Sequence, residues 1–294
     1  MNINVGILHP GEMGVSVAVS ARESGHTVLW ASEGRSPQTC KRAHDHSLVD
    51  TGSLDKLCRV CSVIISVCPP YAAEGIAGQV AAHSFQGLYV DVNAISPERA
   101  IRIGKIMEER GIAFVDGGII GGPAWKSGTT WLYLSGTEAQ RAANCFSAGR
   151  LQTEVIGEMI GQASALKMCY AAYTKGSTAL LCAILGTAEA LGVLDHLEHQ
   201  WERDGSGLAE QAMRQARGVT AKAWRFVGEM EEISATFEEA GMPGGFHQAA
   251  ADVYRRLAKF RGSTETPTLS EVLQALRVGA EKTAQANKAL YRTP

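Results

Sequence analysis

A short apolar run at residues 4–8 breaks into a turn that contains Gly11 and Gly14, and a helix-like pattern follows through Ala21. Backbone amides at the start of a helix bind anions, and glycine lets a ligand approach the backbone closely. Such a turn between a strand and a helix is typical of sites for a dinucleotide pyrophosphate. The motif G-x-G-x-x-G is incomplete because His9 replaces one glycine. A purely structural strand–turn–helix is therefore the alternative. The residues predicted to bind the pyrophosphate are Gly11, Glu12, Met13 and Gly14.

The second strand and the loop after it indicate which dinucleotide is bound. Residues 25–31 have the pattern of a turn and a buried strand, so the three segments fit one crossover unit. Ser32, Arg35 and Ser36 follow this strand, where such folds contact the ribose hydroxyls. A guanidinium flanked by hydroxyls fits a 2′-phosphate, whereas an acidic residue would select NAD. The loop therefore favours NADP. Glu33, which would favour NAD, and a solvated loop arginine are the alternatives.

Two stretches further along contain unusual polar or glycine-rich sequence after predicted strands. Residues 116–130 contain five glycines and are expected to form a loop at the carboxyl end of a parallel sheet. Asn93 follows another strand at the same edge, so both loops are expected to face one crevice. Plain turn chemistry could explain either loop separately. Cys68 and Pro69, directly after the strand at residues 63–67, are also predicted to contact the cofactor.

The elements that must position these residues alternate through the first half of the chain. Further strands are expected at residues 63–67, 88–92, 113–115, 131–134 and 153–156, separated by helix-length segments. This alternation predicts a mostly parallel sheet covered by helices. From about Gly161 the sequence becomes alanine-rich and favours helices up to a last helix at residues 269–290. We expect an α/β Rossmann domain over residues 1–160 and an all-α domain for substrate binding and dimerisation over residues 161–294.

A long helix predicted over residues 163–190 is apolar on most sides, which requires enclosure by a large core or a second subunit. A homodimer is therefore expected. One polar stripe on this helix contains Lys167, Tyr170, Ala171, Thr174 and Thr178, with Lys175 at its margin. Because lysine is rarely buried without a purpose, Lys167 is a candidate for chemistry in a cleft. A surface lysine whose stem covers apolar area is the alternative.

Composition excludes several classes of protein. The chain has 294 residues, 45% of them hydrophobic, and can bury a substantial core; it is long enough for one large or two medium domains. A net charge of −2 without a basic block argues against a nucleic-acid partner. No apolar run resembles a signal peptide or a membrane span, so a cytoplasmic location without membrane contact is expected. The seven cysteines lack framework spacing, and Cys58 and Cys61 do not lie at a helix start. We expect reduced thiols and no metal site.

The order of these motifs resembles the β-hydroxyacid dehydrogenase family, which includes 3-hydroxyisobutyrate and 6-phosphogluconate dehydrogenases. The matching features are the glycine turn, residues 90–97, residues 114–116, the glycine-rich stretch and Lys167. Residues 33–37 and 173–176 are similar to a poorly characterised branch of 6-phosphogluconate-dehydrogenase-like proteins that has its own C-terminal domain type and prefers NADP.

The resemblance implies that Lys167 is the catalytic lysine and moves the hydroxyl proton while a hydride passes between C4 of the nicotinamide and the substrate carbon. It implies that Gly121 or Gly122 matches the substrate-loop glycines. Ile120 and Tyr170 depart from the family's serine and asparagine, so the substrate is expected to be bulkier or less anionic than a small hydroxy acid. The predicted substrate residues are Ile120, Gly121, Gly122, Tyr170, Thr174 and Lys175.

The predicted function is therefore an NADP-dependent oxidoreductase, with NAD possible, that acts on a β-hydroxy acid or a related alcohol or carbonyl compound. An imine reductase is one alternative, although the presence of Lys167 argues against it. A nucleotide-binding regulator without turnover is the other alternative, because a fold does not by itself determine function.

Overall fold

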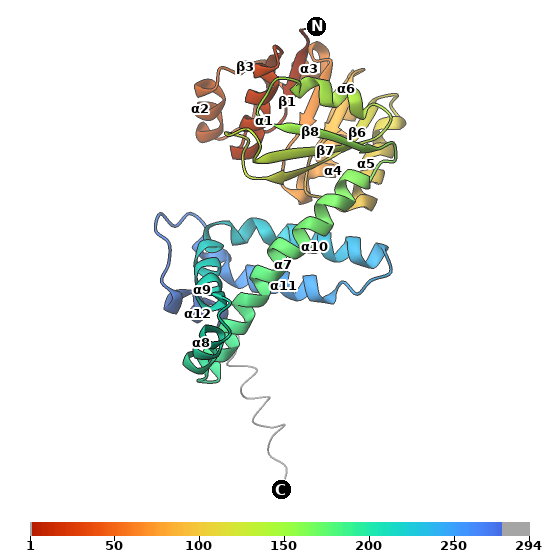
Figure 1. The fold of residues 1–294 in the computed structure, drawn as a ribbon. Coiled ribbons are helices and arrows are strands. Elements are labelled where there is room, and N and C mark those ends of the chain that lie inside the picture. Colours follow the sequence, from red (N-terminus) through yellow and green to blue (C-terminus); the bar gives the residue numbers. More distant parts are fainter. Residues whose placement is uncertain (1, 278–294) are drawn as a thin grey trace. The chain divides into compact units, whose positions relative to one another are not determined.

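Strands and helices alternate through the first half of the chain in the computed structural model, which describes residues 2–277 (Figure 1). Its strands are β1 (Asn4–Ile7), β2 (Thr27–Trp30), β3 (Val49–Asp50), β4 (Val63–Ser66), β5 (Leu88–Asp91), β6 (Ala113–Gly121), β7 (Thr130–Ser135) and β8 (Gln152–Gly157). The helices among them are α1 (Glu12–Glu23), α2 (Pro37–Asp45), α3 (Leu54–Val60), α4 (Ala73–Ala81), α5 (Pro97–Glu108) and α6 (Ala139–Ala143).

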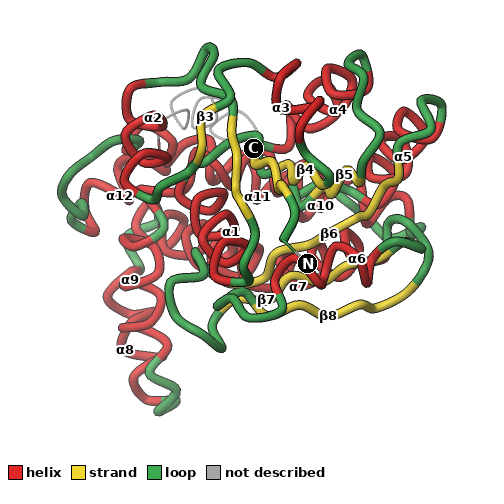
Figure 2. Tube along the Cα trace, turned by 90° about the horizontal axis from the view of Figure 1, so that it is seen from above, coloured by secondary structure: helices red, strands yellow, loops and turns green. Residues whose placement is uncertain are grey.

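These strands form one sheet in the order β3-β2-β1-β4-β5-β6-β7-β8. Only the β6–β7 pair is antiparallel; the other neighbouring pairs within residues 2–277 are parallel. Figure 2 shows β4, β5 and β6 side by side. The first six strands have the order of a doubly wound Rossmann fold, which confirms the predicted fold class.

Alternating side chains along the strands form two apolar cores, one on each face of the sheet. Residues such as Ile7, Ile65 and Val90 pack with α1 and α6 on one face. On the other face, Ile64 and Tyr89 pack with α3, α4 and α5. Helices therefore cover both faces, as the alternation of strands and helices predicts.

The second half contains helices joined by loops, and no strand, within the described residues 162–277, as predicted. Its helices are α7 (Gln162–Ala190), α8 (Leu194–Arg203), α9 (Leu208–Gly218), α10 (Ala223–Glu239), α11 (Gly245–Leu257) and α12 (Leu269–Arg277). The prediction for the last helix extended to residue 290, and residues 278–290 lie outside the described part. Within residues 2–277, no helix combines the length and the apolar character needed to cross a bilayer.

The chain divides into two compact units. Among the described residues, the first holds residues 2–170 together with Ala235–Met242, and the second holds Ala171–Ser234 together with residues 243–277. The predicted domain boundary after residue 160 falls just before α7, and the first turns of α7 belong to the first unit. Lys167 is therefore part of the unit that contains the sheet.

The prediction of a loop over residues 116–130 was wrong for its first part, because β6 continues to Gly121. A Cβ at Gly117 would lie 2.7 Å from Cγ1 of Val92, and a Cβ at Gly118 would lie 2.7 Å from the carbonyl oxygen of Ala163. Real side chains do not tolerate such distances. These two glycines therefore permit close packing on both faces of a strand, and they do not mark a flexible loop.

Candidate active site

The turn after β1 lies at the place where a doubly wound sheet binds its ligand. Strand order reverses between β1 and β4, and ligands bind outside the carboxyl ends of the strands at such a point. Gly11 is the N-cap of α1 and has no side chain to cap the first amides of the helix. A Cβ at Gly11 would have no atom within 4 Å, so open space adjoins these amides. At Gly14, in contrast, a Cβ would collide with the carbonyl oxygen of His9.

Two buried polar atoms beside this turn have no hydrogen-bond partner among the described residues. They are Nδ1 of His9, after β1, and Nε of Arg35, after β2. Burial, and then the positive charge of Arg35, lowers the pKa of His9 to about 4. Buried polar atoms without partners are unfavourable, and an anionic ligand with acceptor oxygens would provide partners for both groups. The residues present therefore fit a dinucleotide carrying phosphate groups.

The serines predicted to flank the phosphate already have local partners. Ser36 caps α2 by accepting a hydrogen bond from the Thr39 amide at 3.2 Å. The backbone amide of Ser32 donates to Oδ1 of Asp50 at 3.2 Å. Arg42, which the sequence did not single out, donates to the carbonyl of Pro10 at 3.3 Å and so connects α2 to the glycine turn. Of the predicted ribose-loop residues, Arg35 is the one with a buried donor atom that lacks a partner.

Asn93 connects the loops that follow β4 and β5. Its Oδ1 accepts a hydrogen bond from the Cys68 amide at 2.5 Å. Its Nδ2 donates to Oδ2 of Asp91 at 2.9 Å and to Oγ of Ser66 at 3.1 Å. The side-chain amide of Asn93 thus fixes the loop that holds Cys68 and Pro69.

Asp91 is fully buried and carries a perturbed carboxyl group. Burial raises the pKa of Asp91 to about 7; the charge of Asp116 on the neighbouring strand adds to the shift, and the hydrogen bonds from Asn93 oppose it. The folded protein therefore binds this proton more tightly than the unfolded chain does.

We expect the Asp91 carboxyl group to make the protein less stable as the pH rises from about 4 to about 7, because its ionisation is disfavoured in the folded state. The free energy of unfolding should fall over this range by about 2 to 4 kcal/mol from this group alone. Urea unfolding at pH 5 and pH 7.5 tests this, with Asp91→Asn as the comparison. His9 contributes with the opposite sign, so the difference between the two proteins is the relevant quantity. Equal pH slopes in both proteins would contradict the assignment.

The first turn of α7 rests on β6 through Asp116. Oδ2 of Asp116 accepts hydrogen bonds from the amides of Gly161 and Ser164, both at 3.0 Å, and from Oγ of Ser135 at 3.1 Å. Oδ1 accepts from Oγ of Ser164 at 2.6 Å. One turn further along, Lys167 lies against the strand: a Cβ at Gly118 would be 2.9 Å from its Cβ. The predicted catalytic lysine is thus held in direct contact with β6.

The predicted substrate-loop residues occupy the end of β6. Gly121 has a φ of 121° and would collide with the carbonyl of Thr129 if it carried a Cβ, so the turn itself requires glycine. Gly122 is exposed, and a Cβ there would meet no atom within 4 Å. Ile120 is half-buried and pairs with Trp131 on β7. Gly122 is therefore the glycine of this pair that leaves room for a ligand.

Tyr170 and Thr174 are exposed on α7, whereas Lys175 is engaged within the second unit. The amine of Lys175 forms an ion pair with Glu229 of α10 and lies 4.9 Å from the centre of the Phe226 ring. Tyr254 donates a hydrogen bond to the carbonyl of Lys175 at 2.6 Å. These contacts give Lys175 a structural role in the second unit.

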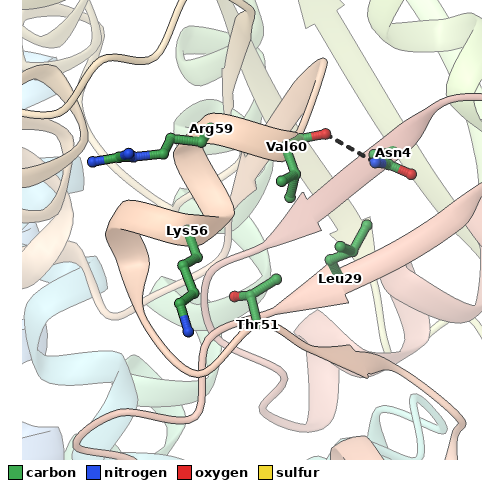
Figure 3. Close-up of a pocket in the computed structure, with 6 residues that line it drawn as sticks. All are labelled: Asn4, Leu29, Thr51, Lys56, Arg59 and Val60. Atoms are coloured by element: carbon green, nitrogen blue, oxygen red, sulfur yellow. Dashed lines mark hydrogen bonds between the residues drawn. The ribbon is translucent and has the colours of Figure 1, made fainter.

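A hollow of about 390 Å³ lies elsewhere on the first unit (Figure 3). It is lined by Asn4, Leu29, Thr51, Lys56, Arg59 and Val60. Asn4 is the first residue of β1, so the hollow reaches the end of that strand opposite to the glycine turn. No predicted site residue lines it. A dinucleotide bound at the carboxyl ends of the strands would not occupy it.

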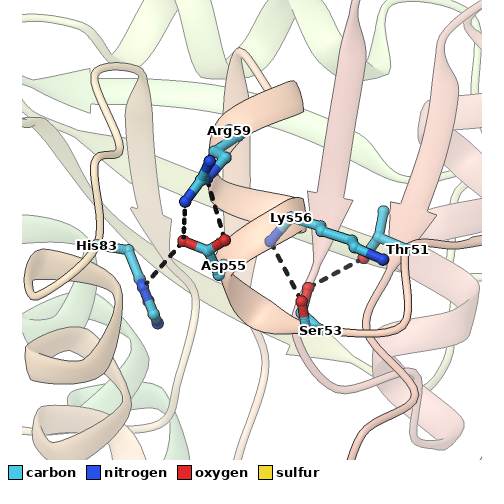
Figure 4. A network of polar contacts seen from close by, with 6 residues as sticks. All are labelled: Thr51, Ser53, Asp55, Lys56, Arg59 and His83. Carbon is cyan, nitrogen blue, oxygen red and sulfur yellow. Dashed lines mark hydrogen bonds and ion pairs between the residues drawn. The ribbon is translucent and has the colours of Figure 1, made fainter.

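The polar residues next to this hollow stabilise α3 (Figure 4). Ser53 caps the helix, and Asp55 pairs with Arg59 at 3.0 Å and with His83 at 3.5 Å. Cys58 and Cys61 lie at the other end of α3, where burial raises the pKa of both thiols, to about 11 and about 12. Such thiols are poor nucleophiles at neutral pH. Residues 2–277 contain no cluster of three or more potential His, Cys, Asp or Glu ligands for a metal.

Comparison with known proteins shows which family this chain belongs to. Residues 4–148 match the family described as "NAD binding domain of 6-phosphogluconate dehydrogenase", and residues 188–257 match a "Domain of unknown function (DUF1932)". An uncharacterised 28.5 kDa protein of Methanothermus fervidus is 33% identical over 202 residues, which cover 68% of this chain and 78% of the relative. The chain belongs to the β-hydroxyacid dehydrogenase family. Its C-terminal domain type places it in a poorly characterised branch, as the sequence motifs predict.

Several solved structures share the fold of this chain. The conserved protein MTH1747, described as structurally similar to 3-hydroxyacid dehydrogenases, is 28% identical to this chain, with a TM-score of 0.62. The match covers 96% of this chain and 99% of the MTH1747 chain. The 3-hydroxyisobutyrate dehydrogenase of Mycobacterium tuberculosis is 19% identical with a TM-score of 0.65, and the match covers 94% of this chain and 100% of the dehydrogenase chain. A reductive aminase from Aspergillus terreus in complex with NADPH and ethyl levulinate is 15% identical with a TM-score of 0.54, and the match covers 94% of this chain and 100% of the aminase chain. The first unit thus contains an NAD-binding domain of the kind found in 6-phosphogluconate dehydrogenase.

Several residues of the site carry no role in the sequence-based prediction. The sequence-based prediction mentions His9 only because it replaces a glycine of the motif. It includes Asp91 and Asp116 only as members of strand motifs. An acidic residue at the end of a strongly apolar strand is a usable signal, because a buried carboxylate requires several donors.

Proposed function

We propose that this protein is an NADP-dependent oxidoreductase that interconverts a β-hydroxy acid, or a related alcohol, and its carbonyl counterpart. The observation that carries the proposal is the position of Lys167, whose Cβ lies against Gly118 of β6 in the same unit as the dinucleotide turn. A lysine on a helix that packs against the sheet of an NAD-binding domain carries an amine with the chemistry of a general acid or base.

The division of roles follows from the residues. The amides at the start of α1 would hold the pyrophosphate, and Arg35 with His9 would meet the phosphate on the ribose side. When bound, the nicotinamide supplies or accepts the hydride. Lys167 would accept the hydroxyl proton during oxidation and return it to the carbonyl oxygen during reduction. Gly122 would leave room for the substrate.

Arg35→Ala tests the preference for NADP. The variant should bind NADPH more weakly by about 1.5 to 3 kcal/mol, because one charge-assisted contact is lost. Its affinity for NADH should stay within about twofold. Fluorescence titration of the bound nicotinamide measures both affinities, and Glu33→Ala serves as the control in the same loop. Equal losses for the two cofactors in Arg35→Ala would refute the assignment.

We also propose that the protein is a homodimer. Apolar side chains remain exposed along α7: Tyr173 is 78% exposed and Leu180 is 46% exposed. Large apolar side chains left exposed on one helix are typical of subunit interfaces. Light scattering at micromolar concentration should give twice the monomer mass, and Leu180→Glu should lower it. A monomer in the unchanged protein would contradict the proposal.

A further inference from the structure

The helix that carries Lys167 has no capping side chain of its own. Its N-cap position is Gly161, since α7 begins at Gln162. The first amides of a helix have no partners within the helix and are normally satisfied by the side chain of the N-cap residue. Here residues of the sheet supply the acceptors, so the start of α7 is tied to the strands.

Three of these amides reach acceptors on β6 and β7. Those of Gly161 and Ser164 donate to Oδ2 of Asp116, and that of Ala163 donates to Oγ of Ser135 at 3.1 Å. Ser135 in turn donates to Asp116, so one carboxylate organises the whole cap. Its negative charge also lies at the positive end of the α7 dipole.

Gly118 lies two residues after Asp116 on the same face of β6, and it too faces the first two turns of α7. A side chain there would press on the Ala163 carbonyl and on Cβ of Lys167. Asp116 holds the first turn of α7 on the strand, and Gly118 allows the second turn to approach it. A second acidic residue, Asp91 of β5, is paired in register with Asp116, and the two carboxyl groups interact electrostatically.

We infer that Asp116 is a positioning residue for the proton transfer assigned to Lys167: with Gly118, it fixes the first two turns of α7 on β6 and hence the location of the lysine amine. The inference rests on the proposed function for the role of Lys167, but the placement of the amine can be tested without turnover. A small misplacement of a catalytic group is costly, because rates depend steeply on the geometry of the reacting groups.

Asp116→Asn, which keeps the size and one acceptor oxygen, should lower kcat by about 10-fold or more, with KM and the NADPH dissociation constant changed by less than about twofold. Ser164→Ala removes only the hydrogen bond to Oδ1 and should have a smaller effect in the same direction. Gly118→Ala would press on the first two turns of α7 from the same face of β6 and should match Asp116→Asn. Ser20→Ala is the control: it removes a buried hydrogen bond, accepted from the Leu151 amide at 3.2 Å, in another part of the unit.

A readout independent of turnover uses the full-length protein with its lysines methylated with ¹³C. The Lys167 signal is the one that is missing in Lys167→Arg, and its titration midpoint reports the surroundings of the amine. Asp116→Asn should move this midpoint by about 0.5 pH unit or more, whereas Ser20→Ala should leave it unchanged.

If Asp116→Asn folds and matches Ser20→Ala in both kcat and midpoint, Asp116 serves stability only and the inference is wrong. If Asp116→Asn does not fold, Ser164→Ala and Gly118→Ala decide by the same criteria. If the midpoint moves while no compound is turned over by the unchanged protein, the positioning role holds and the proposed function fails.

Discussion

Replacing Lys167 with methionine should reduce turnover by about 100-fold or more, the usual effect of losing a positioned acid or base. Methionine keeps the apolar stem that lies against β6, so the fold should persist. NADPH affinity should change by less than about twofold, because the proposed pyrophosphate and phosphate contacts come from the loops after β1 and β2. Steady-state kinetics at the NADPH absorbance band, with a titration of cofactor affinity, measure both quantities.

Lys175→Met is the matched control on the same helix. Lys175 pairs with Glu229, so its loss leaves a carboxylate without a partner and should lower stability more than turnover. If Lys175→Met abolishes turnover while Lys167→Met stays near normal, the placement of the catalytic group is wrong. If both variants remain active, an imine-reductase-like mechanism without an essential lysine gains support.

Gly14→Ala and Gly11→Ala should fail in different ways although both lie in one turn. A Cβ at residue 14 collides with the His9 carbonyl, so Gly14→Ala should lower the free energy of unfolding by about 2 kcal/mol or more. Gly11 has a φ of −69°, which alanine adopts readily, and a Cβ added there would have no atom within 4 Å. Gly11→Ala should therefore stay within about 0.5 kcal/mol of the unchanged protein but bind dinucleotides about 10-fold more weakly.

Urea unfolding and fluorescence titration separate these two outcomes. Normal dinucleotide binding by Gly11→Ala would show that the pyrophosphate does not occupy the space beside this turn. Normal stability of Gly14→Ala would show that the close approach of α1 to the His9 carbonyl is not required for the fold.

The sequence was sufficient to predict the elements that follow from periodicity and turn chemistry. The strand–turn–helix around Gly11, the unbroken α7 and the breaks between the later helices could be predicted because each depends on residues close together in the chain. The strand through Asp116–Gly121 could not. Glycines at 117 and 118 resemble a loop until Val92 and Ala163, which are distant in sequence, are known to pack against them.

The site could be predicted only in part, for a related reason. Lys167 and Arg35 stand out by residue type and position, whereas Asp116 acquires its role only when α7 begins directly above its carboxylate. The buried imidazole of His9 is a similar case, because its pKa is lowered by burial and by the positive charge of Arg35, which comes from a different loop. Contacts between segments that are far apart in sequence decide both cases.

The most direct test of the proposed oxidoreductase follows deuterium from NADPH labelled at C4 of the nicotinamide into product. Hydroxy-acid precursors, sugar-acid carbonyls, aromatic β-keto compounds and cyclic imines form the panel, and mass spectrometry locates the label. We predict transfer from one face of the nicotinamide to a carbon that becomes hydroxyl-bearing, and loss of this transfer in Lys167→Met. Tight NADPH binding with no label transferred to any compound would contradict the proposal and indicate a nucleotide-binding regulator, whereas transfer to imines alone would indicate an imine reductase.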